Sequence, residues 1–252
     1  MGMTGRGILV TGGATGIGLA VVDWFLARGD RVAAGYLDEA HRAEAEGERG
    51  EVLWLRADLR REEEITAMVE RARAELGAIG VLVNCASMTG TASLMPFLDC
   101  TAAFLDDMIG TNLRGAVLVS QAVARAMVRD GRGGASVHVA AVGALAAQEH
   151  ASVYCATKAA QVALGRAMAL ELAPHGIRVN CVSPGDIQTR ASAGVGGGLR
   201  AGGATGRYLR HTPLGRRGRA GEIAAAIGWL ASDEASFVTG ANLVADGGFL
   251  TY

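Results

Sequence analysis

The stretch Gly7-Ile8-Leu9-Val10-Thr11-Gly12-Gly13-Ala14-Thr15-Gly16-Ile17-Gly18 decides the fold. Its first four residues form an apolar run typical of a buried strand, and helix-periodic residues follow from Leu19 to Arg28. Between them lies a glycine-rich turn, where glycine permits positive φ and lets phosphates approach the backbone. The N-terminus of the following helix suits the pyrophosphate of a dinucleotide. An ordinary turn is the alternative, because the G-x-x-x-G-x-G spacing differs from the commoner dinucleotide spacing.

Length and composition bound the class of protein. The 252 residues alternate between strand and helix signals without a linker, which favours one domain over 1–252. Half of the residues are apolar, and the net charge of −1 offers no field that attracts nucleic acid or anionic membrane. No apolar run approaches the roughly 18 residues of a membrane helix, and the first predicted strand begins within seven residues of Met1, so we expect no signal peptide. The four cysteines lack a C-x-x-C pair, so we expect reduced thiols, a cytoplasmic location and no metal site.

The rest of the chain continues the alternation. Strands are predicted at 31–35, 52–56, 81–83, 136–140, 177–182 and 242–244, and helices at 62–76, 100–129, 152–173 and 222–231. The charged stretch 39–51 is predicted to be a solvated helix and turn. Seven glycines among residues 194–206 indicate a flexible segment, interpreted as a substrate lid at about 190–215 or as a surface loop.

The end of the second predicted strand bears on cofactor choice. There an acid reads a ribose 2′-hydroxyl, whereas a basic residue reads a 2′-phosphate. Tyr36 stands at the position expected for the acid, and Asp38 follows two residues later. Asp38 and Glu39 would repel a 2′-phosphate, which favours NAD over NADP. A helix cap explains Asp38 equally well.

Polar residues also follow other strands. Asp58 and Asn84 come at predicted carboxyl ends, which line the ligand crevice of a parallel sheet, although either residue could simply start a loop. Asn112 lies inside a predicted helix, where asparagine costs helix propensity, and an exposed position is the alternative to a site. The basic cluster Arg216, Arg217 and Arg219 would meet an anionic substrate or solvent.

The segment Tyr154-Cys155-Ala156-Thr157-Lys158 carries the candidate chemistry. Positions i and i+4 share one helix face, so Tyr154 and Lys158 point the same way. Lys158 is the only lysine, and the other 23 basic residues are arginine. An ammonium is a compact point charge, unlike a forked guanidinium. It would favour the phenolate of Tyr154, whose reference pKa of about 10 otherwise makes a poor base. His150 lies four residues ahead, where it would touch substrate or face solvent.

Taken together, these segments resemble the short-chain dehydrogenase/reductase family over nearly the whole chain. The matching pieces are TGGATGIG at 11–18, Asp58-Leu59, NCAS at 84–87, Asn112, YCATK at 154–158, PGDIQT at 184–189 and ADGG at 245–248. The resemblance implies a Rossmann-like, doubly wound parallel sheet of about seven strands with helices on both faces. It also implies a nicotinamide cofactor, NAD or NADP, a small alcohol or ketone substrate and a homotetramer.

The resemblance assigns roles to individual residues. Tyr154 would be the acid/base, Lys158 its partner and Asn112 the support of a water relay behind the lysine. The residues expected at the cofactor are Gly12, Thr15, Gly16, Ile17, Gly18, Tyr36, Asp38, Asp58, Leu59, Asn84, Ala86, Tyr154, Lys158, Pro184, Gly185, Ile187 and Thr189. Asp58 would bond the adenine amino group, while Ile187 and Thr189 would hold the nicotinamide carboxamide. The residues expected at the substrate are Ser87, Leu145, Gln148 and His150.

Ala141 departs from the family pattern. The family has a serine 13 residues before the tyrosine, where it bonds the substrate oxygen, but this chain has alanine there. Losing one donor to a developing oxyanion typically costs about 10²–10³ in turnover. The alanine is consistent with a deliberate knock-out, with a natural variant that uses another donor, or with a protein that binds cofactor without turnover.

The function predicted from all of these motifs is an NAD(P)-dependent dehydrogenase or reductase. A sensor or scaffold and an isomerase are the alternatives.

Overall fold

A seven-stranded parallel sheet organises the structure, a computed structural model that describes residues 5–47, 49–192 and 212–251. The strands are β1 (Gly7–Thr11), β2 (Arg31–Tyr36), β3 (Leu53–Arg56), β4 (Val81–Asn84), β5 (Gly134–Val139), β6 (Ile177–Pro184) and β9 (Asn242–Ala245). Their order is β3-β2-β1-β4-β5-β6-β9, with every pair parallel. The short strands β7 (Ile187–Gln188) and β8 (Gly218–Arg219) pair separately. The predicted doubly wound sheet is confirmed, while most of the predicted lid lies outside the described residues.

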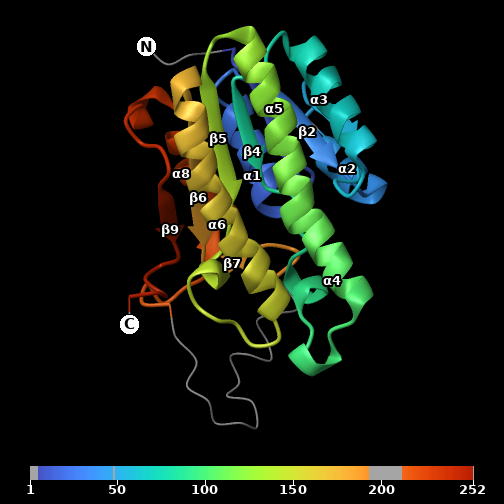
Figure 1. The fold of residues 1–252 in the computed structure, drawn as a ribbon, viewed down its shortest axis with the longest axis vertical. Helices are drawn as coiled ribbons and strands as arrows, with labels where there is room; N and C mark the ends of the chain where they lie inside the picture. The colour runs from blue at the N-terminus through green and yellow to red at the C-terminus, as the bar shows by residue number, and fades with distance from the viewer. Residues whose placement is uncertain (1–4, 48, 193–211, 252) are drawn as a thin grey trace.

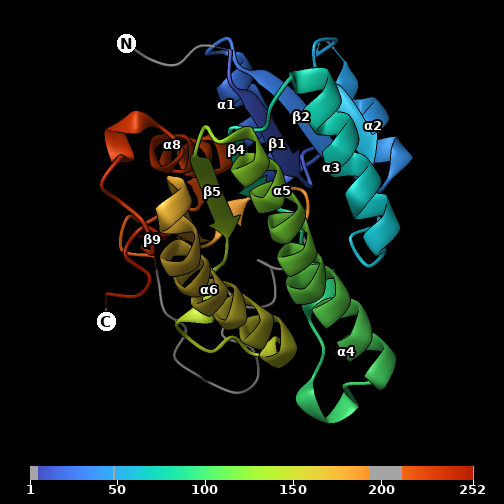
Figure 2. The same cartoon turned by 45° about the horizontal axis from the view of Figure 1, so that its top comes forward.

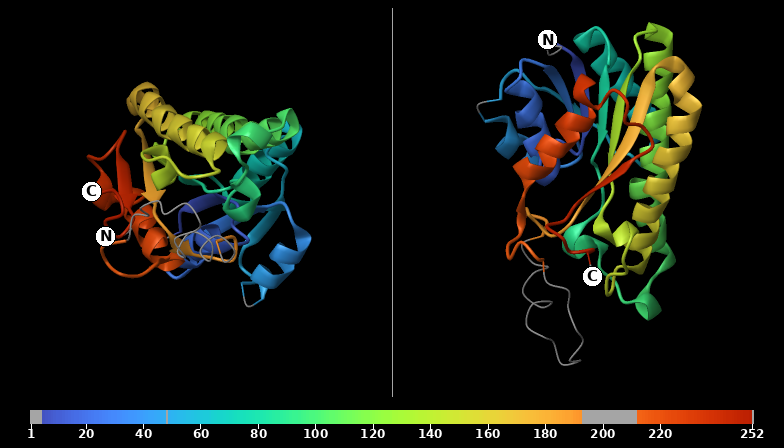
Figure 3. Two further views of the ribbon diagram at one scale, coloured as in Figure 1. Left: turned by 90° about the horizontal axis from the view of Figure 1, so that it is seen from below. Right: turned by 90° about the vertical axis from the view of Figure 1, so that its left-hand side faces the viewer.

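Helices cover both faces of this sheet (Figures 1 and 2). They are α1 (Gly16–Leu26), α2 (Glu39–Glu46), α3 (Glu62–Leu76), α4 (Ala102–Ile109), α5 (Ala116–Asp130), α6 (Ser152–Leu172) and α8 (Ala220–Leu230). Figure 3, which views the molecule from below and from one side, shows α5 and α6 on one face of the sheet and α1 with α8 on the other. None of the helices in the described parts of the chain is long and apolar enough to cross a membrane.

Alternation along β1 explains why its apolar run is continuous. Ile8 and Val10 pack into the cluster that contains Phe25 of α1 and Ile227 of α8. Leu9 points the opposite way, into the cluster formed with α3 and α5. Successive side chains of a strand face opposite sides, so a sheet buried on both faces requires apolar residues at every position. The core therefore fixes the carboxyl end of β1, where the glycine-rich turn begins.

The helix predicted over 100–129 is interrupted, which corrects the sequence interpretation. α4 ends at Ile109, a π-helical turn spans Gly110–Gly115, and α5 begins at Ala116. The turn packs closely on its surroundings, since a Cβ on Gly115 would lie 2.8 Å from Leu59 Cβ. Such π-turns are rare and frequently occur at functional sites. Here the turn carries Asn112, whose side chain is fully buried.

Candidate functional site

The glycine-rich turn between β1 and α1 has a shape that only glycine permits. Gly12 and Gly16 have φ values of +66° and +54°, and a Cβ on Gly18 would lie 2.1 Å from the Gly12 carbonyl oxygen. Thr15 is the N-cap residue of α1 in extended conformation, and its side chain makes no capping hydrogen bond. The first N–H groups of α1 are thus not capped by that side chain, and helix N-termini bind phosphate groups well. The loop fits a dinucleotide pyrophosphate.

Two other predicted segments reach this turn. A Cβ on Gly16 would lie 3.4 Å from Thr189 Cγ2, so the segment after β6 closes over the start of α1. A Cβ on Gly12 would lie 2.8 Å from the Cα of Ala86, which follows β4. The segment after β6 also contains β7, in which Ile187 is buried, with 7% of its surface exposed. The turn, the end of β4 and residues 184–189 therefore form one continuous wall.

Thr11 and Asn84 join the two central strands at their carboxyl ends. They are paired in the parallel register of β1 and β4, and Thr11 Oγ1 donates to Asn84 Oδ1 at 3.1 Å. The same hydroxyl accepts from the backbone N–H groups of Cys85 and Ala86. Asn84 Nδ2 donates to the Ala116 carbonyl oxygen at 3.0 Å. These bonds fix the crevice where the strand order reverses, which is the usual ligand position in such sheets.

At the end of β2, Asp38 caps a helix. Its carboxylate accepts from the His41 backbone N–H at 2.9 Å, and this bond is the main reason why its pKa is lowered. The helix-cap interpretation of Asp38 is confirmed, and its side chain is exposed just after the end of β2. Tyr36 donates its hydroxyl to Glu39 Oε1 at 2.9 Å. Tyr36, the last residue of β2, and Asp38, the N-cap of α2, thus both bond residues in the first turn of α2.

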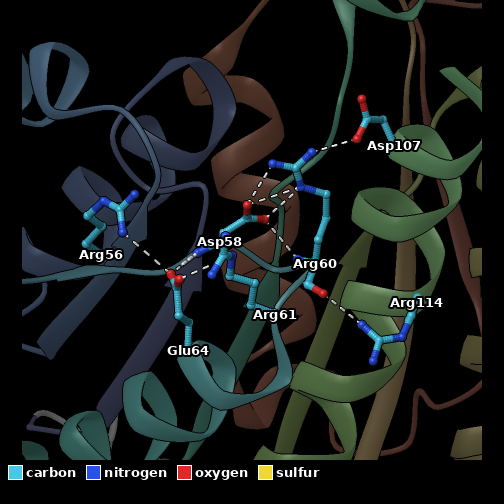
Figure 4. Close-up of polar contacts among 7 residues, drawn as sticks. All are labelled: Arg56, Asp58, Arg60, Arg61, Glu64, Asp107 and Arg114. Atoms are coloured by element: carbon cyan, nitrogen blue, oxygen red, sulfur yellow. Dashed lines mark hydrogen bonds and ion pairs between the residues drawn. The ribbon is translucent and has the colours of Figure 1, made fainter. Parts of the chain in front are cut away.

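Asp58, the residue expected at the adenine, is engaged by Arg60 (Figure 4). Arg60 Nη2 lies 2.7 Å from Asp58 Oδ2, while Nη1 lies 2.6 Å from Asp107 Oδ1 in α4. Hydrogen bonds from Arg60 are the largest cause of the lowered pKa of Asp58. The Arg60 carbonyl accepts from Arg114 of the π-turn. Arg60, which the sequence did not single out, therefore ties the predicted adenine position to the segment carrying Asn112.

Tyr154 and Lys158 lie together on α6, as their spacing predicted. Lys158 Nζ is 5.7 Å from the centroid of the Tyr154 ring and donates to the Val139 carbonyl oxygen at 2.9 Å. Burial lowers the pKa of Lys158 to about 8. Burial also raises the pKa of Tyr154, and a hydrogen bond with the Thr89 side chain opposes that shift. Thr89 is therefore a second hydroxyl residue near the tyrosine, and the sequence carried no periodic signal for it.

Asn112 holds the loop that carries Thr89. Its Oδ1 accepts from the Met88 N–H at 2.7 Å, and its Nδ2 donates to the Met88 carbonyl oxygen at 3.1 Å. Nδ2 also lies 3.3 Å from Thr157 Oγ1 on α6. The side chain thus connects the loop after β4 with the tyrosine helix, which places Asn112 behind the site rather than on an exposed surface.

Gln161 completes this buried network, although the sequence analysis did not identify it. It is 2% exposed, accepts from Lys158 Nζ at 3.1 Å and donates to the Asn112 backbone oxygen at 2.5 Å. The available signal was its position three residues after Lys158, which puts both on one helix face. A polar side chain at that spacing on an apolar helix indicates a partner of the lysine.

Ala141 lies two residues after the end of β5, in extended conformation, and is 8% exposed. The predicted substrate residues differ in their exposure. Ser87 is half-buried and donates to the Met88 carbonyl oxygen, whereas Leu145 and Gln148 are exposed. His150 is also exposed with φ of +58°, and its carbonyl oxygen accepts from the Met95 N–H at 2.6 Å. The solvent-facing interpretation of His150 matches this geometry.

The basic cluster at the end of the site is neutralised by neighbours. Arg217 Nη2 lies 2.7 Å from Asp186 Oδ1, and Arg216 Nη2 lies 2.6 Å from Glu222 Oε1. Glu222 also accepts from the Arg219 backbone N–H at 2.8 Å. These ion pairs favour the structural interpretation of the cluster over an anion-binding one.

Comparison with known proteins gives consistent matches over nearly the full length. A family model described as Enoyl-(Acyl carrier protein) reductase matches residues 12–250. D-threitol dehydrogenase of Mycolicibacterium smegmatis is 36% identical over 251 residues, covering 98% of this chain and 94% of that protein. Cis-4-hydroxycyclohexanecarboxylate dehydrogenase of Sinomonas cyclohexanicum is 37% identical over 256 residues, covering 97% and 96%. The solved structure of a short-chain type dehydrogenase/reductase from Mycobacterium marinum superposes with a TM-score of 0.89 at 34% identity, covering 99% of this chain and 97% of that one.

Proposed function

The chain belongs to the short-chain dehydrogenase/reductase family, and on that premise we propose that it interconverts a secondary alcohol and a ketone with Tyr154 as acid/base. It is an oxidoreductase of CH–OH groups, as its relatives' names indicate. The observation that carries the specific proposal is the pairing of the half-buried Tyr154 with the buried Lys158, whose Nζ lies 5.7 Å from the centroid of the Tyr154 ring. Pairs of titratable groups whose pKa values are shifted by burial are typical of catalytic sites.

The proposed chemistry assigns proton transfer to this chain. NAD(P) supplies or accepts the hydride when bound. Tyr154 gives its phenolic proton to the substrate oxygen during reduction and removes it during oxidation. Because burial raises the pKa of Tyr154, a neighbouring positive charge is needed to favour the phenolate, and the Lys158 ammonium is placed to provide it.

A substitute for the missing serine is also proposed. Ala141 cannot donate a hydrogen bond, but the Thr89 side chain lies near enough to the Tyr154 phenol to lower its pKa. A donor beside the acid/base is suitably placed to bond the same substrate oxygen. We assign this role to Thr89, with Asn112 holding its loop through both backbone atoms of Met88. With Thr89 as the donor, Ala141 fits a natural variant that turns over substrate better than it fits an inactive protein.

The cofactor role of the glycine turn rests on its crowded geometry. We propose one NAD(P)-binding domain over 1–252, with Gly12, Gly16 and Gly18 at the pyrophosphate and the remaining predicted residues around it. NAD is preferred in this proposal, because the exposed carboxylate of Asp38 would repel a 2′-phosphate.

Assembly and location are proposed on separate grounds. Family membership supports a homotetramer. Exposed apolar side chains, such as Leu170 on α6, which is 80% exposed, and the fully exposed Phe237, are suited to subunit contacts. The four cysteines are free thiols, which suits a reducing cytoplasm.

A catalytically weak sensor or scaffold is the alternative, and Ala141 is the observation that favours it. The test is a nicotinamide absorbance assay with NAD and NADP over secondary alcohols and ketones. The panel should include D-threitol and cis-4-hydroxycyclohexanecarboxylate, the substrates in the names of two relatives. Turnover of at least one substrate supports the proposal. If the chain binds cofactor yet turns over no member, including with serine at position 141, the binding-protein alternative is favoured.

A further inference from the structure

The side chain of Gln161 bridges the lysine and the π-turn inside the core. Its Oε1 accepts from Lys158 Nζ at 3.1 Å, and its Nε2 donates to the Asn112 backbone oxygen at 2.5 Å. A backbone carbonyl can only accept and an ammonium can only donate, so only one orientation of the amide satisfies both partners. The neighbours of Gln161 therefore fix which of its ends faces the lysine.

The groups around Lys158 leave its charge dependent on neutral acceptors. Described titratable neighbours are Tyr154 on α6, Cys85 after β4, His138 on β5 and Cys181 on β6. Burial raises the pKa of Cys85 to about 11 and of Cys181 to about 12, so both thiols are neutral near pH 7. Burial also raises the pKa of Tyr154 and lowers that of His138 to about 4, which leaves these two neutral as well.

Neutral oxygen atoms must therefore stabilise the buried ammonium. The two oxygen atoms that accept hydrogen bonds from it are the Val139 carbonyl oxygen, at 2.9 Å, and Gln161 Oε1, at 3.1 Å. Two of the three ammonium N–H groups are thereby used, and the Tyr154 ring centroid lies 5.7 Å from the same nitrogen. The backbone oxygen of Val139 cannot be removed by substitution, whereas the amide of Gln161 can.

We propose that Gln161 is a positioning residue that keeps Lys158 charged and aimed at the reacting groups, coupling it to the turn that carries Asn112. The inference rests on the proposed function for its consequence in catalysis. The bridge itself is independent of turnover. Replacing Gln161 with leucine removes an acceptor of the charged form, so Lys158 must lose its proton at lower pH. Replacing it with glutamate adds an opposite charge, so Lys158 must keep its proton to higher pH.

The sequence offers a direct test, because Lys158 is the only lysine. Protein labelled with ε-¹³C-lysine, carrying a tag without lysine, gives one lysine side-chain resonance whose chemical shift reports the titration. The Gln161→Leu midpoint should fall by about one pH unit or more, because a hydrogen bond to a charged group is among the stronger ones. The Gln161→Glu midpoint should rise, and Val162→Ala, at a buried neighbouring position on α6, should leave it unchanged.

Opposite shifts in two variants cannot come from loosened packing alone, which would move both midpoints the same way. Midpoints that coincide with the parent in both variants would overturn the inference. If Gln161→Leu does not fold, Gln161→Glu alone tests the inference. A Lys158 titration midpoint that is unchanged or lowered in Gln161→Glu would contradict it. The titration needs neither substrate nor cofactor, so it separates this inference from the proposed function. The pH profile of kcat/KM then reports on catalysis, and its alkaline limb should move in the same directions.

Discussion

Gly12 faces Ala86 so closely that a Cβ on Gly12 would lie 2.8 Å from the Ala86 Cα, and Gly12 also has φ of +66°. Gly12→Ala should therefore displace the turn and weaken NAD(P) binding by at least tenfold, as measured by fluorescence titration. Gly29→Ala is the matched control, since Gly29 has φ of +76° but no neighbouring atom within 4 Å. The control shares the backbone strain without the crowding. Equal loss of binding in both variants would argue against a cofactor role for the turn.

Thr89 and Ala141 should behave as alternative donors. Thr89→Val should lower kcat by about 10²-fold on the best substrate, because one donor to the oxyanion is removed. Ala141→Ser restores the family's hydroxyl and should make the Thr89→Val loss much smaller in the double variant. Steady-state kinetics of the parent, the two single variants and the double variant gives the coupling free energy between positions 89 and 141. Full activity in Thr89→Val alone would show that the donor lies elsewhere.

Asp38→Asn separates the two roles of this residue. Asparagine is as good an N-cap as aspartate, so α2 should stay formed while the charge is lost. The ratio of kcat/KM for NADP to that for NAD should rise by several-fold, because repulsion of a 2′-phosphate is removed. Circular dichroism checks that the helix content is retained. An unchanged ratio would place the cofactor discrimination at another residue.

His138 should make the fold sensitive to acid. Burial lowers its pKa to about 4, from an unfolded value near 6.5, so the unfolded chain binds the extra proton first as pH falls. Stability is then present above pH 6.5 and is lost between about pH 6.5 and pH 4, by roughly 3 kcal/mol. Urea unfolding at pH 7 and pH 4 should show a smaller acid loss for His138→Leu. Substitution of exposed His175 by leucine should leave the loss intact, and equal losses in parent and His138→Leu would contradict this account.

Local patterns were sufficient to predict most of the sheet. The glycine turn, the apolar run of β1 and the i, i+4 pair of Tyr154 and Lys158 depend on neighbours in the chain, and each is found as expected. The bounds of α3 agree with the prediction, because its charged first turn and the left-handed Gly77 mark both ends. Such signals lie within one element and need no knowledge of tertiary packing.

The contacts between distant segments were not predictable in this way. Thr89 follows Met88, whose backbone is held by Asn112, and the buried Asn112 itself lies in a π-turn. Gln161 gains its importance from the Asn112 carbonyl oxygen, 49 positions away in sequence. Periodicity assumes a regular helix, so it could not anticipate the break at Gly110–Gly115.

The central claim is that Tyr154 exchanges the proton with the substrate oxygen. The most direct test compares kcat of the parent and Tyr154→Phe on the best substrate, with cofactor affinity measured for both by titration. The account predicts a loss of about 10²–10⁴ in kcat, the usual contribution of a general acid or base, with cofactor affinity changed less than about twofold. A phenylalanine variant that keeps more than about a tenth of the parent kcat would contradict the claim, because no phenolic proton is then needed.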